Sequence, residues 1–234
     1  MPRDSRKARA AAARKAMERM RRQERRRRWL FTGAMTGFVA AIVLAVVLVV
    51  AFHQPGRVAA SPAIPATPLA TAQGRTDQPP WSLPADTTAQ VRAAALPMLT
   101  TEGTVEHIHA HLDVIVNGQP VVVPADIGID RSTGRLSPLH THDTTGVLHV
   151  ESPAQADFSL GQLFTEWQVT LSANQIGGLK AGDGKVLQSY VNGKPYQGDP
   201  AGIILRAHDE IAIVYSTPAQ QPDPPSTYAF SAGL

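Results

Sequence analysis

The sequence predicts an α+β protein in which a single-pass N-terminal transmembrane helix precedes a β-rich exterior domain. Three observations support this prediction. A run of 24 uncharged residues follows a basic N-terminus, a Pro/Ala-rich segment comes next, and the remaining sequence alternates apolar and polar residues between turn signals. Within the domain we expect a mixed or antiparallel sheet with one covering helix, for which a β-grasp-like arrangement is one candidate.

The net charge of +3 over 234 residues is unevenly distributed. Residues 1–28 contain 13 Lys and Arg against 3 acidic side chains, whereas residues 29–234 contain 9 basic and 16 acidic ones. The basic average therefore comes from one short terminal run, which excludes a uniformly basic nucleic-acid-binding domain. The chain has no cysteine, so disulfides, thiolate nucleophiles and Cys-based metal sites are excluded as well.

Residues 29–52 form the predicted transmembrane helix. At 1.5 Å per residue they reach about 36 Å, enough to cross a hydrocarbon core of about 30 Å. Arg25 to Arg28 abut one end, so the positive-inside rule places the basic tail 1–28 in the cytoplasm and the rest outside it. We also expect the tail to contact anionic membrane lipid. A cleaved signal peptide is the alternative, although its apolar core normally has only about 7–15 residues.

The chain beyond the membrane divides by composition into three parts. Residues 53–85 are rich in Pro and Ala and lack apolar periodicity, which predicts an extended stalk. Residues 218–234 form a second Pro-rich segment, a predicted tail. The folded domain is therefore expected at residues 86–217, a length sufficient for a hydrophobic core.

Two alternating runs predict strands in the first half of the domain. Residues 105–116 alternate strictly, and Asn117-Gly118 then predicts a hairpin turn that leads into residues 121–123. The second run covers residues 147–151. Both runs place apolar side chains on one face and polar side chains, several of them histidines, on the other.

The second half of the domain contains one predicted helix and further strands. Ser159 and Gln162 form a capping-box pattern ahead of an apolar stripe at helical spacing, which predicts the covering helix. Asn192-Gly193 predicts another hairpin turn. Strands are expected near residues 186–191, 203–205 and 210–215.

Six of the eight histidines lie in the 43 residues from 107 to 149, and their spacing predicts a metal site. Three of them occupy alternate positions of the 105–116 strand, so they share a face at successive distances of about 6.6 Å. Two more flank a threonine in a loop, and the last lies two residues before Glu151. The candidate metal ligands are His107, His109, His111, His140, His142 and His149.

Neutral imidazole is a good ligand for several transition metals, so we expect a transition metal ion, copper or zinc, as the cofactor. Glu151, Asp143 and Glu106 are the candidate catalytic bases and could also orient a histidine ring. Met98 is the only methionine beyond the predicted membrane helix, so any bound copper is expected as Cu(II) or as Cu(I) held by histidine alone. His208 fits a turn residue and an additional ligand equally well.

Three functions are compatible with these features. The leading hypothesis is a membrane-anchored extracytoplasmic metal-binding module for metal reception, buffering or delivery. The second is a metal-dependent enzyme with a three-histidine open site and hydrolytic or oxygen-dependent chemistry. The third is a structural or assembly partner of a membrane complex. The expected partners are membrane lipid and a metal-receiving or membrane protein complex, and no nucleic acid.

Overall fold

The structure is a computed structural model that describes residues 17, 20–22, 25–26, 29 and 63–234. The chain divides into two units, Met1–Ala59 and Ala60–Leu234. The described residues of the first unit are helical and exposed. Apart from Trp29, the predicted transmembrane segment 29–52 lies outside the described residues. Within the described part of the chain, no helix has the length and apolar character needed to cross a membrane.

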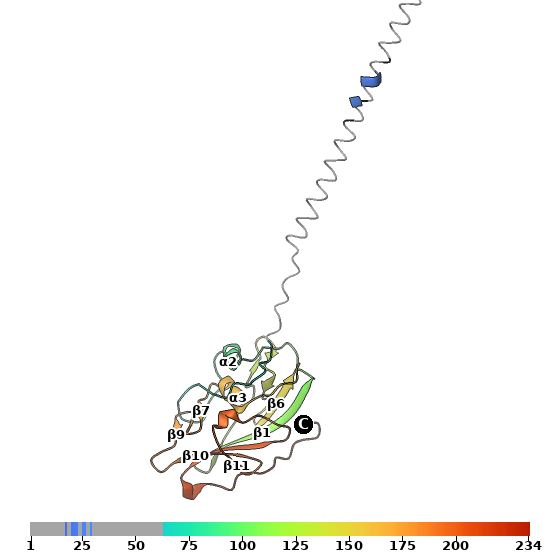
Figure 1. Ribbon diagram of the computed structural model, residues 1–234. Helices are drawn as coiled ribbons and strands as arrows, with labels where there is room; N and C mark the ends of the chain where they lie inside the picture. The colour runs from blue at the N-terminus through green and yellow to red at the C-terminus, as the bar shows by residue number, and fades with distance from the viewer. Residues whose placement is uncertain (1–16, 18–19, 23–24, 27–28, 30–62) are drawn as a thin grey trace, which may run out of the picture. The chain divides into compact units, whose positions relative to one another are not determined.

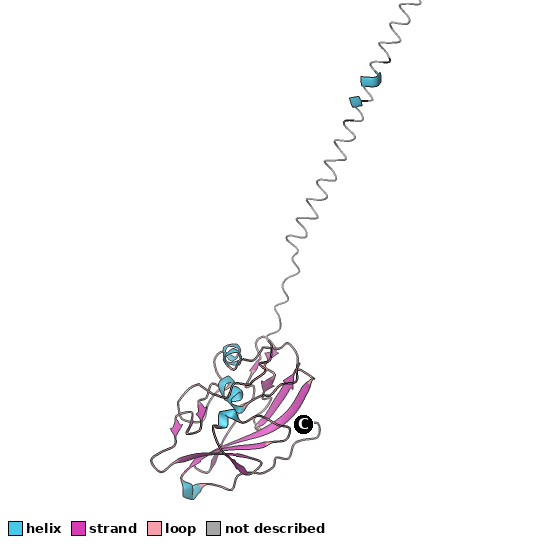
Figure 2. Cartoon of the chain, viewed as in Figure 1, coloured by secondary structure: helices cyan, strands magenta, loops and turns pink. Residues whose placement is uncertain are grey.

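A seven-stranded mixed sheet forms the centre of the second unit (Figures 1 and 2). Its order is β11-β10-β12-β1-β6-β5, and β2 also pairs with β1. The central pair, β1 and β12, is parallel, and the other pairs are antiparallel. The strands are β1 Glu106–Val116, β2 Gln119–Val121, β5 Leu139–His140, β6 Val147–Ser152, β10 Val186–Val191, β11 Lys194–Tyr196 and β12 Glu210–Ser216. This sheet confirms the prediction of a β-rich domain with few helices.

The remaining elements are short. The antiparallel pair β3–β4 consists of Ile129–Asp130 and Arg135–Leu136. The three-stranded sheet β7–β8–β9 consists of Leu171–Ser172, Gln175–Ile176 and Leu179–Lys180. The helical elements are α2 Thr87–Ala93, α3 Leu160–Glu166 and the 3-10 turns η1 Pro200–Gly202 and η2 Pro218–Gln220. The helix α2 was not predicted from the sequence.

Both Asn-Gly pairs form the predicted hairpin turns. Asn117 and Gly118 have φ angles of 52° and 78°, and they join β1 to β2. Asn192 and Gly193 have φ angles of 51° and 72°, and they join β10 to β11. Two successive residues with positive φ are characteristic of the type I′ turn, which Asn and Gly tolerate better than other residues. The positions of these hairpins therefore follow from local chemistry.

The covering helix α3 also forms as predicted. The Ser159 side chain accepts a hydrogen bond from the backbone N–H of Gln162, and the Gln162 side chain accepts one from the backbone N–H of Ser159, both at 3.1 Å. Leu163 and Phe164 of α3 belong to the same buried core as Leu112 of β1. The helix thus packs on the apolar face of the sheet, and the histidine-bearing face of β1 is directed away from it.

The strand predicted at residues 203–205 is wrong. Only Ile204 forms a bridge, and its partner is Ser159 rather than a strand of the sheet. The Ile203 carbonyl accepts a hydrogen bond from Leu160 N at 2.8 Å, and Leu205 N donates one to the Phe158 carbonyl at 2.9 Å. The segment therefore uses its backbone groups to hold the start of α3.

Residues of the predicted stalk and tail pack against the domain. Trp81, only 2% exposed, meets Trp167 edge to face at 5.6 Å between ring centroids. The Arg75 side chain donates a hydrogen bond to the Gln168 carbonyl at 3.2 Å. In the tail, Tyr228 stacks on His111 at 3.8 Å between centroids. The packed unit therefore extends beyond the predicted limits of 86–217 on both sides.

Candidate metal centre

A row of histidines crosses three neighbouring strands. His109 of β1 lies opposite His149 of β6, and His149 lies opposite His140 of β5. On the same face, His107 lies opposite Glu151. Because adjacent strands are about 4.8 Å apart and directly paired residues share a face, this register brings side chains that are distant in sequence into contact.

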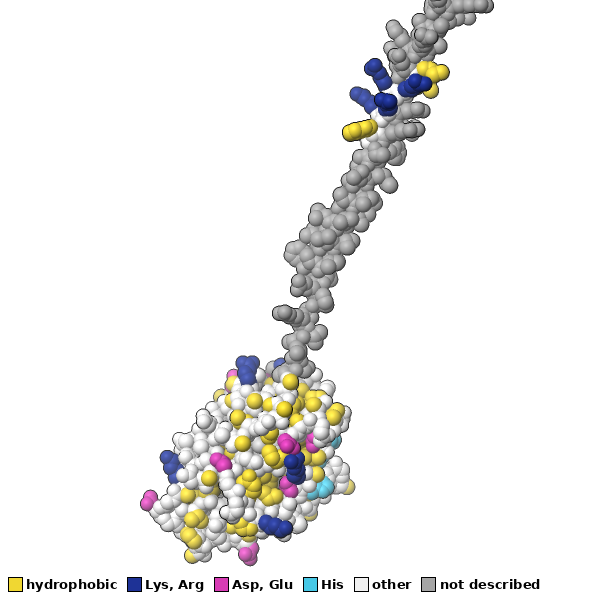
Figure 3. All heavy atoms as spheres, viewed as in Figure 1, with side chains coloured by type: hydrophobic (Ala, Val, Ile, Leu, Met, Phe, Trp, Pro, Cys, Tyr) yellow, Lys and Arg dark blue, Asp and Glu magenta, His cyan; other side chains and the backbone are white. Residues whose placement is uncertain are grey.

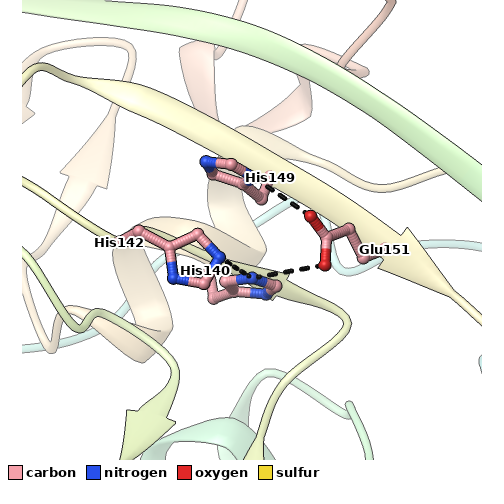
Figure 4. Close-up of side chains that lie close together, drawn as sticks. All are labelled: His140, His142, His149 and Glu151. Carbon is pink, nitrogen blue, oxygen red and sulfur yellow. Dashed lines mark hydrogen bonds and ion pairs between the residues drawn. The ribbon is translucent and has the colours of Figure 1, made fainter. Parts of the chain in front are cut away.

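The inner group consists of His140, His142, His149 and Glu151 (Figure 4). Each contributes one ligand atom, and these four atoms lie within 4.8 Å of one another. His140 Nε2 is 3.1 Å from His142 Nε2 and 3.8 Å from Glu151 Oε2, and His149 Nδ1 is 3.1 Å from Glu151 Oε1. Three imidazole nitrogens with one carboxylate oxygen form a donor set suited to zinc and other divalent transition metals.

The outer group consists of His107, His109 and the same Glu151. His107 Nε2 and His109 Nε2 lie 3.6 Å and 4.0 Å from Glu151 Oε1. His109 is buried, whereas the His107 side chain is 52% exposed. The outer group therefore extends from the buried carboxylate to the solvent.

His111, the third histidine of β1, belongs to a separate group with Asp113 and Glu210. Its Nδ1 lies 2.8 Å from Glu210 Oε2, and its Nε2 lies 2.8 Å from the Thr145 carbonyl oxygen. The parallel pairing of β1 with β12 places Glu210 directly opposite His111. Both ring nitrogens are thus engaged, and the structure does not bring His111 together with the other five candidate ligands.

The protonation states in the inner and outer groups suit metal binding. Burial lowers the pKa of His140 to about 4, and burial with the neighbouring His149 and His107 lowers the pKa of His109 to about 4. Both rings are therefore neutral at neutral pH, the form that coordinates metal. Burial opposes ionisation of Glu151, but the His149 hydrogen bond and the charges of His140 and His149 outweigh it and lower its pKa to about 2. The carboxylate is thus ionised.

Two buried atoms of the inner and outer groups lack a hydrogen-bond partner among the described residues: His109 Nε2 and Glu151 Oε2. Leaving a buried carboxylate oxygen without a donor or a cation is costly, because the interior cannot replace its lost hydration. A divalent cation would satisfy the carboxylate and the imidazole lone pairs together. The buried His/Glu groups could therefore hold a transition metal ion.

A buried network orients His140. Its Nδ1 donates a hydrogen bond to the Ser137 carbonyl at 2.9 Å, which leaves Nε2 directed at the inner group. The Ser137 hydroxyl in turn donates to Glu166 Oε1 at 2.5 Å. Burial raises the pKa of Glu166 well above its usual value, so this carboxyl group is held protonated. Such outer contacts fix the tautomer and orientation of a metal-binding histidine.

The other candidate residues lie outside the three groups. Glu106 lies on the other face of β1, where its carboxylate accepts a hydrogen bond from Ala156 N at 3.4 Å. The Asp143 carboxylate accepts one from Thr145 N at 2.8 Å within the loop. His208 is a turn residue with a φ of 62°, and its Nε2 lies 3.1 Å from the Leu234 carbonyl. Of the three candidate bases, only Glu151 lies among the histidines.

Two acidic residues near the centre were missed from the sequence. Glu102 Oε1 lies 3.6 Å from His142 Nε2, but Glu102 precedes β1 in an irregular segment that carries no periodic signal. Glu166 did have a signal, because it is the only charged residue of α3. A carboxyl group on an otherwise buried helix indicates a specific polar partner, here Ser137.

The centre is accessible from solvent on one side. The side chains of His142 and His107 are 40% and 52% exposed, whereas His140 is fully buried. In the space-filling view, histidine side chains reach the surface of the domain beside acidic ones (Figure 3). An ion could therefore enter without unfolding of the sheet.

No protein-family model matches the chain, and neither does any curated protein or solved structure. The assignment of function therefore rests on the geometry of the site.

Proposed function

We propose that this protein is a membrane-anchored, extracytoplasmic metal-binding module that receives, buffers or delivers copper or zinc. One observation carries the proposal. Three imidazole nitrogens and a buried, ionised carboxylate converge within 4.8 Å, and one carboxylate oxygen has no hydrogen-bond donor. A divalent cation is the ligand that compensates this charge and uses these lone pairs.

The available donors favour a borderline metal ion. The chain has no cysteine, and Met98 is buried in the hydrophobic core, so thiolate and thioether sulfur are absent from the described site. Histidine with carboxylate suits Zn²⁺ and Cu²⁺, whereas Cu⁺ usually has sulfur ligands. The exposed rings of His142 and His107 favour an exchangeable ion over a sealed structural one.

The membrane anchor and the orientation belong to the same proposal. The basic tail 1–28 and the apolar run 29–52 place the domain outside the cytoplasm by the positive-inside rule. The partners would then be membrane lipid and a metal-receiving protein or membrane complex. The proposal includes no nucleic-acid partner, because the basic residues are concentrated in the tail 1–28 and residues 29–234 carry more acidic than basic side chains.

A reporter enzyme fused after Leu234 tests the orientation. We expect a reporter that works only outside the cytoplasm to be active and one that works only inside to be silent. The opposite pattern would overturn the topology.

A metal-dependent enzyme is the second candidate, and Glu102 favours it. Its carboxylate oxygen lies 3.6 Å from His142 Nε2, and both side chains are partly exposed to solvent. If the inner group held an ion with a bound water, Glu102 could act as the general base for that water. Conversion of a substrate by the metal-loaded chain, with loss of turnover but not of metal in Glu102→Gln, would support this candidate.

Metal titration of the purified full-length chain tests the metal site. We expect Zn²⁺ and Cu²⁺ to bind, and His140→Asn with His149→Asn to weaken binding more than about 100-fold, the upper end of what outer-shell changes cost. His208→Asn is the matched control, since His208 lies outside the three groups.

Two results would contradict metal binding by the inner group. One is a chain that binds no Zn²⁺ or Cu²⁺ while remaining folded. The other is equal binding by the wild type and the double variant. Either result would favour the third hypothesis, a structural or assembly partner in which the histidines only stabilise the fold.

A further inference from the structure

The Glu151 carboxylate lies between two sets of histidines. Its Oε2 faces the inner group, 3.8 Å from His140 Nε2. Its Oε1 lies 3.1 Å from His149 Nδ1 of the inner group, and it also lies 3.6 Å from His107 Nε2 and 4.0 Å from His109 Nε2 of the outer group. A single carboxylate on β6 therefore contacts histidines of both groups, with His140 of β5 on one side and the β1 histidines on the other.

His109 has no role in the inner group, although it is buried. Its Nε2 is buried and has no hydrogen-bond partner among the described residues. The ring packs edge to face against His149 at 4.6 Å between centroids and against His107 at 5.0 Å. An unpartnered ring nitrogen at a buried site is destabilising unless something binds it.

We propose that His107, His109 and Glu151 hold a second divalent transition-metal ion, so that Glu151 bridges two ions. This inference rests on the proposed function, because Glu151 is shared with the inner group. It also assigns a role to His109 Nε2 and places both carboxylate oxygens on cations.

The spacing of the outer group fits an ion after small side-chain movements. Nitrogen and oxygen ligands at about 2.0–2.1 Å from a tetrahedral ion lie about 3.3 Å from one another. The separations of 3.6 Å and 4.0 Å exceed this by less than 1 Å. Two ions that share a bridging ligand are usually about 3.5–4 Å apart, a distance that one carboxylate can span.

The remaining coordination positions face the solvent. His107 and His142 are the exposed members of the two groups, and Glu102 lies beside His142. Water or hydroxide can complete both ions there and reduce the excess positive charge that two dications bring to one carboxylate. The second ion is therefore expected to exchange more readily than the first, because it has only two histidine ligands.

The number of bound ions tests this inference. We expect the full-length chain to bind two equivalents of Zn²⁺ and the double variant His107→Asn/His109→Asn to bind one. If the double variant does not fold, the single variant His107→Asn still tests the inference. His107 is half exposed, and its replacement leaves the buried ring of His109 in place. Loaded with Cu²⁺, the wild type is expected to show magnetic coupling between two ions, and His107→Asn an uncoupled single-ion spectrum.

The outcomes distinguish failure of the second site from failure of the proposed function. One equivalent in the wild type that is unaffected by His107→Asn would overturn the second site and leave metal binding intact. Loss of every ion from the β1 variants would also overturn it, since all the histidines would then serve one ion. No binding in the folded wild type would overturn both proposals.

Discussion

Glu151 carries the only carboxylate common to the inner and outer groups. Its replacement by Gln therefore tests whether metal binding depends on the charge of this side chain. Glu151→Gln keeps the size of the side chain but removes its charge. We expect Zn²⁺ at 100 times the dissociation constant to stabilise the wild type by about 2.7 kcal/mol. This corresponds to a rise of about 5–10 °C in the melting temperature. The variant should show a much smaller rise, as measured by thermal unfolding with and without Zn²⁺.

Glu106→Gln is the matched control for this prediction. It makes the same change on the other face of β1, outside the three groups. An equal Zn²⁺ effect in the wild type and Glu151→Gln would contradict the role of Glu151. Without metal, we expect Glu151→Gln to be less stable than the wild type at neutral pH, because the lowered pKa of Glu151 means that the folded protein favours the ionised carboxylate.

The buried carboxyl group of Glu166 predicts that part of the stability of the fold decreases as the pH rises. Its folded-state pKa is raised by burial, so the folded state holds this proton at pH values where the unfolded state releases it. The contribution of Glu166 is therefore present below about pH 4.5 and is lost as the pH rises. Glu166→Gln keeps an acceptor for Ser137 and removes this loss. Relative to the wild type, we expect the variant to be more stable at pH 8 than at pH 4.

Urea unfolding of both proteins in chelator measures this difference across the pH range. Other titrating groups cancel in the comparison, because the wild type and Glu166→Gln share them. A constant difference from pH 4 to pH 8 would show that Glu166 is ionised in the folded protein.

The histidine row across β1, β6 and β5 predicts acid sensitivity of the metal-free sheet. The folded-state pKa of His140 is lowered from 6.5 to about 4, so between these values the unfolded state binds a proton that the folded state does not. Stability therefore falls as the pH falls through this window, by about 3 kcal/mol for His140. We expect His140→Asn to show a smaller loss between pH 7 and pH 4 in urea unfolding with chelator. Parallel pH curves would contradict this prediction.

Local chemistry explains which elements were predictable. The Asn-Gly hairpins and the α3 capping box depend on residues that are adjacent in the sequence, and both formed as predicted. The grouping of the histidines depends on strand register. The spacing of the histidines could not show that His111 and His109 belong to different groups, because the partner of His111, Glu210, is 99 residues away on β12. The face of β1 was thus predictable, whereas the assignment of each histidine to a group was not.

Trp81 tests how far the packed unit extends toward the N-terminus. It lies in the segment predicted as a stalk, yet it is buried against Trp167 and donates a hydrogen bond to the Asp77 carbonyl at 3.0 Å. Large-to-small changes of a buried aromatic cost about 3–5 kcal/mol. We expect Trp81→Ala in the full chain to lose this much in denaturant unfolding. Val122→Ala, at a site 59% exposed, should change stability by less than about 0.5 kcal/mol.

A small effect of Trp81→Ala, similar to that of Val122→Ala, would restore the boundary at residue 86. Composition alone could not place this boundary. Prolines prevent regular helix and strand in residues 63–85, but they do not prevent irregular chain from packing through single aromatic and aliphatic side chains such as Trp81 and Ala72.

The cross-strand register has a mechanical consequence for a chain that has no cysteine. Ions bound in the inner and outer groups and bridged by Glu151 would cross-link β1 to β5 and close the loop between His109 and His140. In the chain-entropy account, a cross-link over a loop of about 15 residues contributes about 3 kcal/mol, and a longer loop contributes slightly more. The bound metal would then act as disulfides do in many secreted proteins, with bonds that chelation can open and rebinding can close.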